Sequence, residues 1–186
     1  PLFGCDVHGK TLGIVGMGNI GAAIARRGRL GFNMPILYSG NSRKTALEQE
    51  LGAQFRSLDQ LLAEADFVCL VVPLSEKTRH LISHRELALM KPEAILVNIS
   101  RGPVVDEPAL IAALQDGTIR GAGLDVYEKE PLSASPLFQL ANAVTLPHVG
   151  SATAETREAM ANRAIDNLRA ALLGERPRDL VNPQVW

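Results

Sequence analysis

The sequence predicts an α/β fold, a doubly wound parallel sheet of about seven strands with helices on both faces. Short apolar runs alternate with helical patterns along the chain, and the connections between them are short. Residues 67–72 are apolar at every position, which is typical of a parallel strand buried on both faces. Because ligands of such sheets bind beyond the carboxyl ends of the strands, functional residues are expected in the loops that follow strands.

Composition limits the partners that the chain is expected to have. Its 186 residues suit one domain with a full core, and its net charge of −1 gives no bulk field that would attract nucleic acid or an anionic membrane. No apolar run has the length of a membrane span, and the N-terminus lacks a signal-peptide pattern. Cys69 lies inside an apolar run, so we expect a buried thiol and a cytoplasmic location.

The first element is residues 11–21, an apolar strand that breaks into glycines and continues as an Ala/Arg-rich helix. Gly16 permits the tight turn, Gly18 has no Cβ to block a pyrophosphate, and Gly21 lets the helix lie close to the strand. Free N–H groups at the helix start would face the phosphates. This context is typical of the NAD(P)-binding Rossmann fold. Cofactor contacts are expected from Gly16, Met17, Gly18, Asn19, Ile20 and Gly21.

The remaining elements follow in order. Strands are expected at residues 35–38, 53–56, 67–72, 94–99, 119–126 and 143–146. Helices are expected at residues 20–30, 45–51, 57–64, 87–90, 106–114 and 152–173. Ser57 and Asp106 are expected to cap helix starts, and Gly31, Gly52 and Gly117 are expected to stop helices.

The residues after the second strand predict the choice of dinucleotide. Chains that prefer NAD usually carry a carboxylate there, and this chain has Ser39 followed by Asn41, Ser42, Arg43 and Lys44. A charge pair near 4 Å is worth about 4 kcal/mol at an effective dielectric constant of ~20, against about 1 kcal/mol for a neutral hydrogen bond. The balance favours NADP(H), with NAD(H) possible. The alternative is that Arg43 and Lys44 form only a solvated basic helix start.

Three polar residues follow three different strands: Arg101, Glu130 and His148. An arginine can hold a carboxylate in a bidentate fork, and a histidine can exchange a proton near neutral pH. A carboxylate hydrogen-bonded to that histidine would orient its ring and favour its protonated form. These residues predict the reduction of a 2-oxo acid, and no metal site is expected.

At these residues the chain closely resembles the D-isomer-specific 2-hydroxyacid dehydrogenase family. The matching segments are residues 16–21, residues 72–74 with Thr78 and residues 81–82, residues 98–103, residues 105–107, residues 125–131 and residues 147–151. They follow one another in the family's order and span nearly the whole chain. Residues 31–38 resemble the glyoxylate/hydroxypyruvate and 2-ketogluconate reductase branch.

The resemblance implies a role for each matching residue. Arg101 would bind the substrate carboxylate, and His148 would be the general acid in reduction, with Glu130 as its partner. Asp125 would contact the nicotinamide end of the cofactor. The other cofactor contacts implied are Val72, Pro73 and Thr78 on the adenosine side, together with Ile99, Ser100, Arg101, His148 and Gly150.

The resemblance also implies a domain organisation. Residues 1–10 would be a linker from a missing N-terminal substrate domain, residues 11–150 the dinucleotide-binding domain, and residues 151–186 a terminal helix and tail that cross back toward the missing domain. The expected function is hydride transfer between NADP(H) and a small 2-oxo acid such as glyoxylate, hydroxypyruvate or 2-ketogluconate, in a homodimer. The alternatives are an NAD(H)-sensing corepressor-like module, or a phosphoglycerate, formate or phosphite dehydrogenase.

Overall fold

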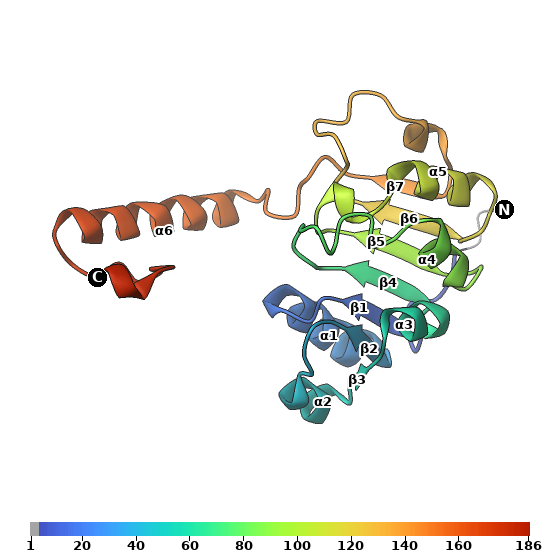
Figure 1. Ribbon diagram of the computed structural model, residues 1–186, viewed down its shortest axis with the longest axis horizontal. Helices are drawn as coiled ribbons and strands as arrows, with labels where there is room; N and C mark the ends of the chain where they lie inside the picture. The colour runs from blue at the N-terminus through green and yellow to red at the C-terminus, as the bar shows by residue number, and fades with distance from the viewer. Residues whose placement is uncertain (1–3) are drawn as a thin grey trace. The chain divides into compact units, whose positions relative to one another are not determined.

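The computed structural model describes residues 4–186 and divides into two compact units, Pro1–Pro147 and His148–Trp186. The first unit is built on a parallel sheet with the strand order β3-β2-β1-β4-β5-β6-β7 (Figure 1). Its strands are β1 (Leu12–Val15), β2 (Ile36–Ser39), β3 (Gln54–Phe55), β4 (Phe67–Leu70), β5 (Ile95–Asn98), β6 (Gly121–Leu124) and β7 (Ala143–Thr145). The order reverses between β1 and β4, which is the doubly wound arrangement that the sequence predicts.

Helices connect these strands. They are α1 (Asn19–Phe32), α2 (Thr45–Leu51), α3 (Leu58–Glu64), α4 (His84–Leu89) and α5 (Glu107–Gln115), with short 3₁₀ turns at Gly102–Val104 and Pro136–Gln139. Each expected helix of this unit is present. The pattern over residues 87–90 marks only the end of α4, which begins at His84 where the Ser83 N–H donates to the Glu86 carboxylate at 3.2 Å.

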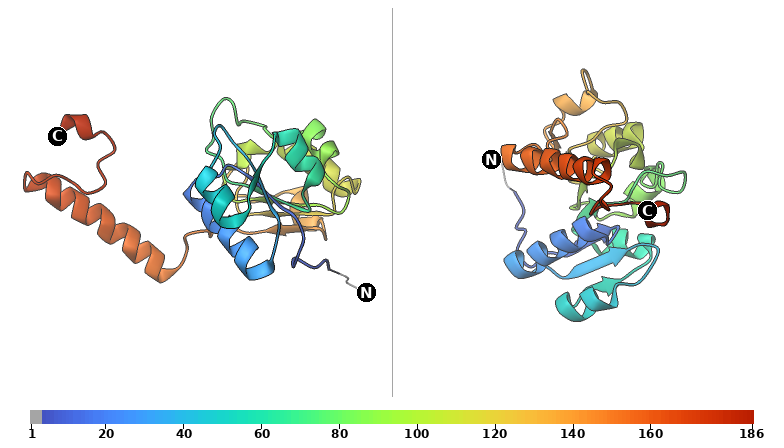
Figure 2. Two further views of the ribbon diagram at one scale, coloured as in Figure 1. Left: turned by 90° about the horizontal axis from the view of Figure 1, so that it is seen from below. Right: turned by 90° about the vertical axis from the view of Figure 1, so that its left-hand side faces the viewer.

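Helices cover both faces of the sheet, because alternate residues of one strand enter two different cores. Ile14 of β1 packs in a cluster with Ala25 of α1 and Leu47 of α2. Its neighbour Val15 packs in a second cluster with Leu61 of α3 and with residues of α4 and α5. This two-sided burial is what continuous apolar strands require, and it confirms the predicted α/β class (Figure 2).

The expected caps are mostly confirmed. Ser57 and Gln60 form a reciprocal capping box, with bonds of 3.2 and 3.0 Å, and Asp106 accepts from the Ala109 N–H at 3.2 Å. The expected stop at Gly31 is wrong, because α1 continues to Phe32 and ends where Asn33 adopts a left-handed φ of 50°. Asparagine tolerates that conformation, so glycine is not required there.

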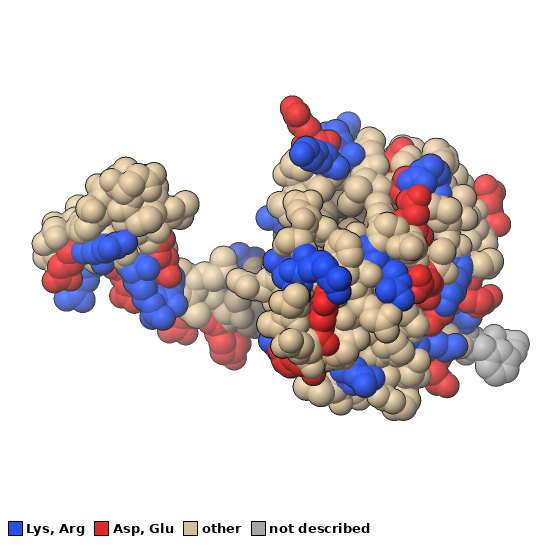
Figure 3. Space-filling view, turned by 60° about the horizontal axis from the view of Figure 1, so that its bottom comes forward, with Lys and Arg blue, Asp and Glu red and all other residues tan. Residues whose placement is uncertain are grey.

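The two cysteines are free thiols, and burial raises the pKa of the Cys69 thiol to about 12. Cys69 therefore stays protonated and packs as a small apolar side chain. On the face drawn in Figure 3, acidic and basic side chains of the first unit are interspersed, without an extended patch of one sign. This distribution agrees with the near-zero net charge of the sequence.

The second unit contains α6 (Ala154–Leu172) and a short 3₁₀ turn at Pro183–Val185. Thr153 caps α6 by accepting from the Thr156 N–H, and Asn167 exchanges two hydrogen bonds with Asp179 of the tail. The apolar stripe of this helix is exposed, and Leu172 keeps 78% of its surface in solvent. Among residues 4–186, no helix combines the length and the apolarity that a membrane crossing needs.

Candidate functional site

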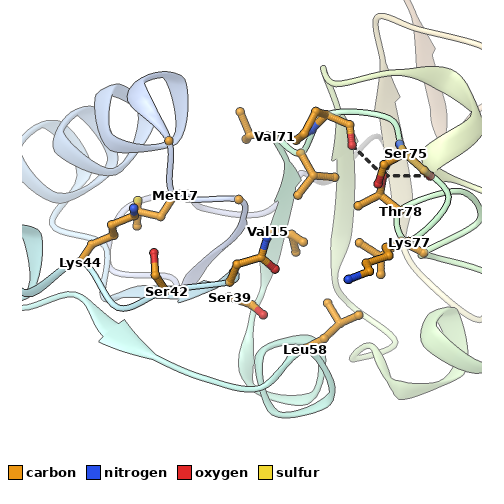
Figure 4. A pocket seen from close by; sticks show the side chains of 17 residues that line it. Val15, Met17, Ser39, Ser42, Lys44, Leu58, Val71, Ser75, Lys77 and Thr78 are labelled. Carbon is orange, nitrogen blue, oxygen red and sulfur yellow. Dashed lines mark hydrogen bonds between the residues drawn. The ribbon is translucent and has the colours of Figure 1, made fainter.

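A cavity of about 570 Å³ lies at the carboxyl ends of β1, β2 and β4, where the strand order reverses (Figure 4). Its volume is within the range of small-molecule and cofactor sites. Of the residues expected to contact a cofactor, the structure places these in its lining: Gly16, Met17, Gly18, Ser39, Asn41, Ser42, Val72, Pro73 and Thr78. Segments as far apart in sequence as Gly16 and Thr78 thus line one cavity.

The glycine turn at the end of β1 forms one side of this cavity. Gly16 has a φ of 102°, and a Cβ added there would lie 2.7 Å from the Val71 carbonyl oxygen. A Cβ on Gly21 would meet the Gly16 carbonyl oxygen and would lie 3.2 Å from Cγ2 of Ile14. A Cβ on Gly18 would meet nothing within 4 Å. Backbone packing therefore requires the outer two glycines, whereas Gly18 faces open space.

The start of α1 is suited to an anion. Gly18 is its N-cap residue, with no side-chain oxygen to occupy the first N–H groups, and no acidic residue lies in its first turn. Free N–H groups at the positive end of a helix dipole attract phosphate. The helix has 14 residues, beginning with the expected contacts Asn19, Ile20 and Gly21.

The loop after β2 is held by the buried Tyr38. The Tyr38 hydroxyl donates to Oε1 of Glu48 at 2.6 Å and accepts from the Lys44 N–H at 2.6 Å. Arg43 forms two bonds to the Glu48 carboxylate, at 3.0 and 2.8 Å, and these bonds lower the pKa of Glu48. Burial raises the pKa of Tyr38, so its hydroxyl remains a donor at neutral pH. Arg43 is thus engaged with α2 and is absent from the cavity lining, whereas Lys44 is present in it.

The loop after β4 forms the opposite wall. The Thr78 hydroxyl donates to the Pro73 carbonyl at 2.6 Å and accepts from the Ser75 N–H at 2.8 Å. These bonds close a turn over residues 73–78 and fix its geometry. Lys77 lies in this turn and lines the cavity, although sequence reasoning did not select it. Its place in a loop after a buried strand is the signal that could have identified it.

The turn after β5 carries Arg101 and is built on the buried Asn98. Oδ1 of Asn98 accepts from the N–H and the hydroxyl of Ser100, at 3.0 and 2.7 Å, and its amide nitrogen donates to the Arg101 carbonyl at 3.2 Å. Sequence reasoning assigned Asn98 no role beyond the strand. Arg101 is exposed, and its guanidinium donates to the Ser100 carbonyl at 2.6 Å. Ile99 and Ser100 follow β5 as expected.

The loop after β6 lies against this turn. Gly102 leaves no room for a side chain beside the backbone of Tyr127 and Glu128. The Tyr127 hydroxyl donates to the carbonyls of Leu124 and Leu146, at 3.1 and 2.8 Å, and its N–H donates to Glu130 at 3.1 Å. The structure therefore brings the loops of Arg101 and Glu130 together. Asp125 is buried at the end of β6.

His148 and Gly150 belong to the second unit. His148 is exposed and adopts a left-handed φ of 54°, an uncommon conformation for a residue with a side chain. Residues held in such conformations cluster at functional sites. The φ of His148 therefore supports a functional role for this residue.

His80 lies between the loop after β4 and the loop after β6, and sequence reasoning did not predict this position. Nε2 of His80 is 2.8 Å from Oε1 of Glu128, and a carboxylate oxygen of Asp106 lies within 4.8 Å of the side chains of both residues. Asp106 already accepts from the Ser83 hydroxyl at 2.8 Å. The pair joins the loop after β4 to the loop after β6.

The chain matches a known family over most of its length. Residues 2–150 match the family model described as D-isomer specific 2-hydroxyacid dehydrogenase, NAD binding domain. Glyoxylate/hydroxypyruvate reductase B of Yersinia pestis (strain Pestoides F) is 59% identical over 184 residues, which are 98% of this chain and 56% of that protein. The chain thus spans a little over half the length of the curated relatives that it matches.

Solved structures give the same result. The TT0316 protein of Thermus thermophilus matches with a TM-score of 0.90 and 47% identity, over 96% of this chain and 56% of that chain. An NADPH-dependent glyoxylate/hydroxypyruvate reductase of Sinorhizobium meliloti, in complex with NADP and malonate, matches with a TM-score of 0.84 and 38% identity. That match covers 91% of this chain and 52% of the other.

Proposed function

The chain belongs to the D-isomer specific 2-hydroxyacid dehydrogenase family, and from that premise we propose that it is the cofactor-binding half of an NADP(H)-dependent 2-oxo acid reductase. The substrates proposed are glyoxylate and hydroxypyruvate, the acids in the names of its relatives, with 2-ketogluconate as a third. The observation that carries the proposal is the cavity at the reversal of strand order, bordered by the glycine turn at the start of α1.

The residues around the cavity fit a dinucleotide. The open side of Gly18 leaves space for a diphosphate, and the start of α1 offers N–H groups without a competing carboxylate. Val72 and Pro73 supply an apolar wall for an adenosine, and Ser39 and Ser42 supply hydroxyl groups near its ribose. We assign residues 11–150 to dinucleotide binding on these grounds.

For catalysis, we assign the substrate carboxylate to Arg101, whose fork can bind it through two parallel hydrogen bonds. His148 gives a proton to the substrate 2-oxo oxygen during reduction, and Glu130 holds the imidazole in the orientation for that transfer. A bound nicotinamide cofactor supplies the hydride to the substrate carbon. The close packing of Gly102 against the backbone of Tyr127 and Glu128, which brings together the loops that carry Arg101 and Glu130, supports this assignment.

The first test is a calorimetric titration of the 186-residue chain with NADPH and, in parallel, with NADH. We expect NADPH to bind at least about tenfold more tightly, since the cavity lining has cations and no carboxylate to accept from a ribose 2′-OH. Equal affinities, or tighter binding of NADH, would contradict the proposed preference. Absence of binding of both would contradict dinucleotide binding itself.

The second test is Gly18→Ala. A Cβ at this position enters the space proposed for the diphosphate, so NADPH affinity should fall by roughly tenfold or more. The free energy of unfolding should change by less than about 1 kcal/mol, because no protein atom lies within 4 Å of the new carbon.

Gly21→Ala is the matched control for that variant. Its Cβ meets the Gly16 carbonyl oxygen, so thermal unfolding should occur at a lower temperature even without ligand. If Gly18→Ala binds NADPH like the wild type while folding normally, the diphosphate does not lie at this turn.

The second unit supports a further part of the proposal. The exposed apolar stripe of α6, which includes Met160, Leu168 and Leu172, is suited to packing against another protein surface. We propose that residues 151–186 contact a substrate domain of the kind that the relatives' additional length would supply. Homodimer formation and a cytoplasmic location stay predictions.

A further inference from the structure

We propose that Lys77 and Lys44 bind the 2′-phosphate of NADP(H) from opposite walls of the cavity, and that Arg43 acts only by positioning the loop that carries Lys44. This inference rests on the proposed function. It assigns the cofactor choice to a residue of the loop after β4, whereas the sequence pattern directs attention to the loop after β2 alone.

The placement of the two lysines carries the first step. Lys44 immediately precedes α2, and Lys77 lies in the turn after β4, yet both line the same cavity. In Figure 4 their side chains approach from opposite sides, and the hydroxyl groups of Ser39 and Ser42 lie between them. Ser39 and Ser42 would supply hydroxyl donors to a phosphate bound here, and the flexible stems of the two lysines would let their ammonium groups turn toward it.

The charges carry the second step. No aspartate or glutamate is among the residues that line this cavity. Within residues 4–186, neither an ion pair nor a hydrogen bond engages the ammonium group of Lys44 or of Lys77. The cavity therefore has two cations without an internal counter-ion. An anionic ligand bound in the cavity would supply the counter-charge that these residues lack.

The contrast with Arg43 carries the third step. Its guanidinium donates two charge-assisted hydrogen bonds to Glu48, at 3.0 and 2.8 Å, so its charge is compensated within the protein. Glu48 also accepts from Tyr38, whose hydroxyl receives the Lys44 N–H. Arg43 is thus connected to Lys44 through Glu48 and Tyr38. It stabilises the backbone position from which Lys44 reaches the cavity.

The turn of residues 73–78 gives Lys77 a comparable support. The Thr78 hydroxyl bridges the Pro73 carbonyl and the Ser75 N–H, so the backbone next to Lys77 is held without using the lysine side chain. Lys77 itself is exposed. Its replacement should therefore change ligand binding without changing the stability of the fold.

The test compares Lys77→Gln with the matched control Arg79→Gln. Arg79 is a cation in the same loop but is absent from the cavity lining, so both variants lose one charge within two residues of each other. Binding of NADPH and NADH to the 186-residue chain is followed by the fluorescence of the reduced nicotinamide ring. Adenosine 2′,5′-bisphosphate and 5′-AMP, which differ only in the 2′-phosphate, serve as competitors.

We expect Lys77→Gln to weaken binding of NADPH and of the bisphosphate about tenfold, which corresponds to about 1.4 kcal/mol. Binding of NADH and 5′-AMP should stay within twofold, and Arg79→Gln should leave all four ligands within twofold. Lys44→Gln should repeat the Lys77→Gln pattern, and its effect should shrink at high salt.

Two results would overturn the inference while leaving dinucleotide binding intact. One is that Lys77→Gln lowers the affinities for NADPH and NADH by the same factor. The other is that Arg79→Gln lowers the affinity for NADPH as much as Lys77→Gln does, which would indicate a general effect of positive charge in this loop. A wild-type chain that binds neither dinucleotide would instead overturn the proposed function, and the inference with it. Unchanged thermal unfolding of each variant establishes that its fold is preserved.

Discussion

Gly102→Ala should lower the free energy of unfolding by more than about 3 kcal/mol. A Cβ on Gly102 would overlap the carbonyl group of Tyr127 and the nitrogen of Glu128, so the obstacle is backbone and not the end of a flexible side chain. The Tyr127 backbone cannot easily move aside. Its hydroxyl is bonded to Leu124 and Leu146, and its N–H is bonded to Glu130.

Urea denaturation followed by circular dichroism measures this effect. Gly31→Ala is the control, because Gly31 lies inside α1 with nothing within 4 Å of an added Cβ. Alanine there should stabilise the protein by about 0.5–1 kcal/mol, so the two substitutions should shift the midpoint in opposite directions. A Gly102→Ala midpoint close to that of the wild type would mean that the loops of Arg101 and Glu130 are not packed as the structure has them.

The first unit was predictable from sequence because its signals are local. The run at residues 67–72 is apolar throughout, and its first four residues form β4 (Phe67–Leu70). The Ser57–Gln60 capping box needs only residues three apart, and both of its hydrogen bonds are present. Most strands were predicted one or two residues too long at their ends, because apolar side chains continue into the following loops, whereas β2 ends one residue later than predicted, at Ser39.

The end of α1 shows where local signals fail. Gly31 and Asn33 both can end a helix in the left-handed conformation, and the sequence pattern does not rank them. The structure ends α1 at Asn33, whose neighbour Met34 is buried between α1 and the sheet side chains of its cluster. The burial of Met34 depends on tertiary contacts with distant residues, which a sequence window of a few residues does not include.

The candidate site was predictable only in part for the same reason. The rule that ligands lie beyond strand ends selected the loops after β1, β2 and β4, and the expected contacts in these loops mostly line one cavity. The pairing of Arg43 with Glu48 depends on the orientation of α2 relative to the loop that precedes it. The pairing of His80 with Glu128 joins residues 48 positions apart in sequence. Lys77 has no motif of its own, and its place in a loop after a buried strand is the one signal for it in the sequence.

His148→Asn should produce the largest loss of activity, when measured in a protein that joins this chain to the remaining part of a matched relative. We expect the turnover number for glyoxylate reduction to fall by about 10²–10⁴-fold, because the proposed proton donor is removed. Asparagine suits the test, since His148 adopts a φ of 54° and asparagine tolerates that conformation. The NADPH dissociation constant should remain within twofold.

His84→Asn is the matched control, because His84 is an exposed histidine at the start of α4 and has no expected role in catalysis. A loss confined to His148→Asn, with unchanged thermal unfolding, separates proton transfer from damage to the fold. Glu130→Gln should lower turnover by less than His148→Asn, since it removes the group that orients the imidazole and not the imidazole itself. Normal turnover in His148→Asn would require another proton donor, and His80, 2.8 Å from Glu128, would then be the next residue to replace.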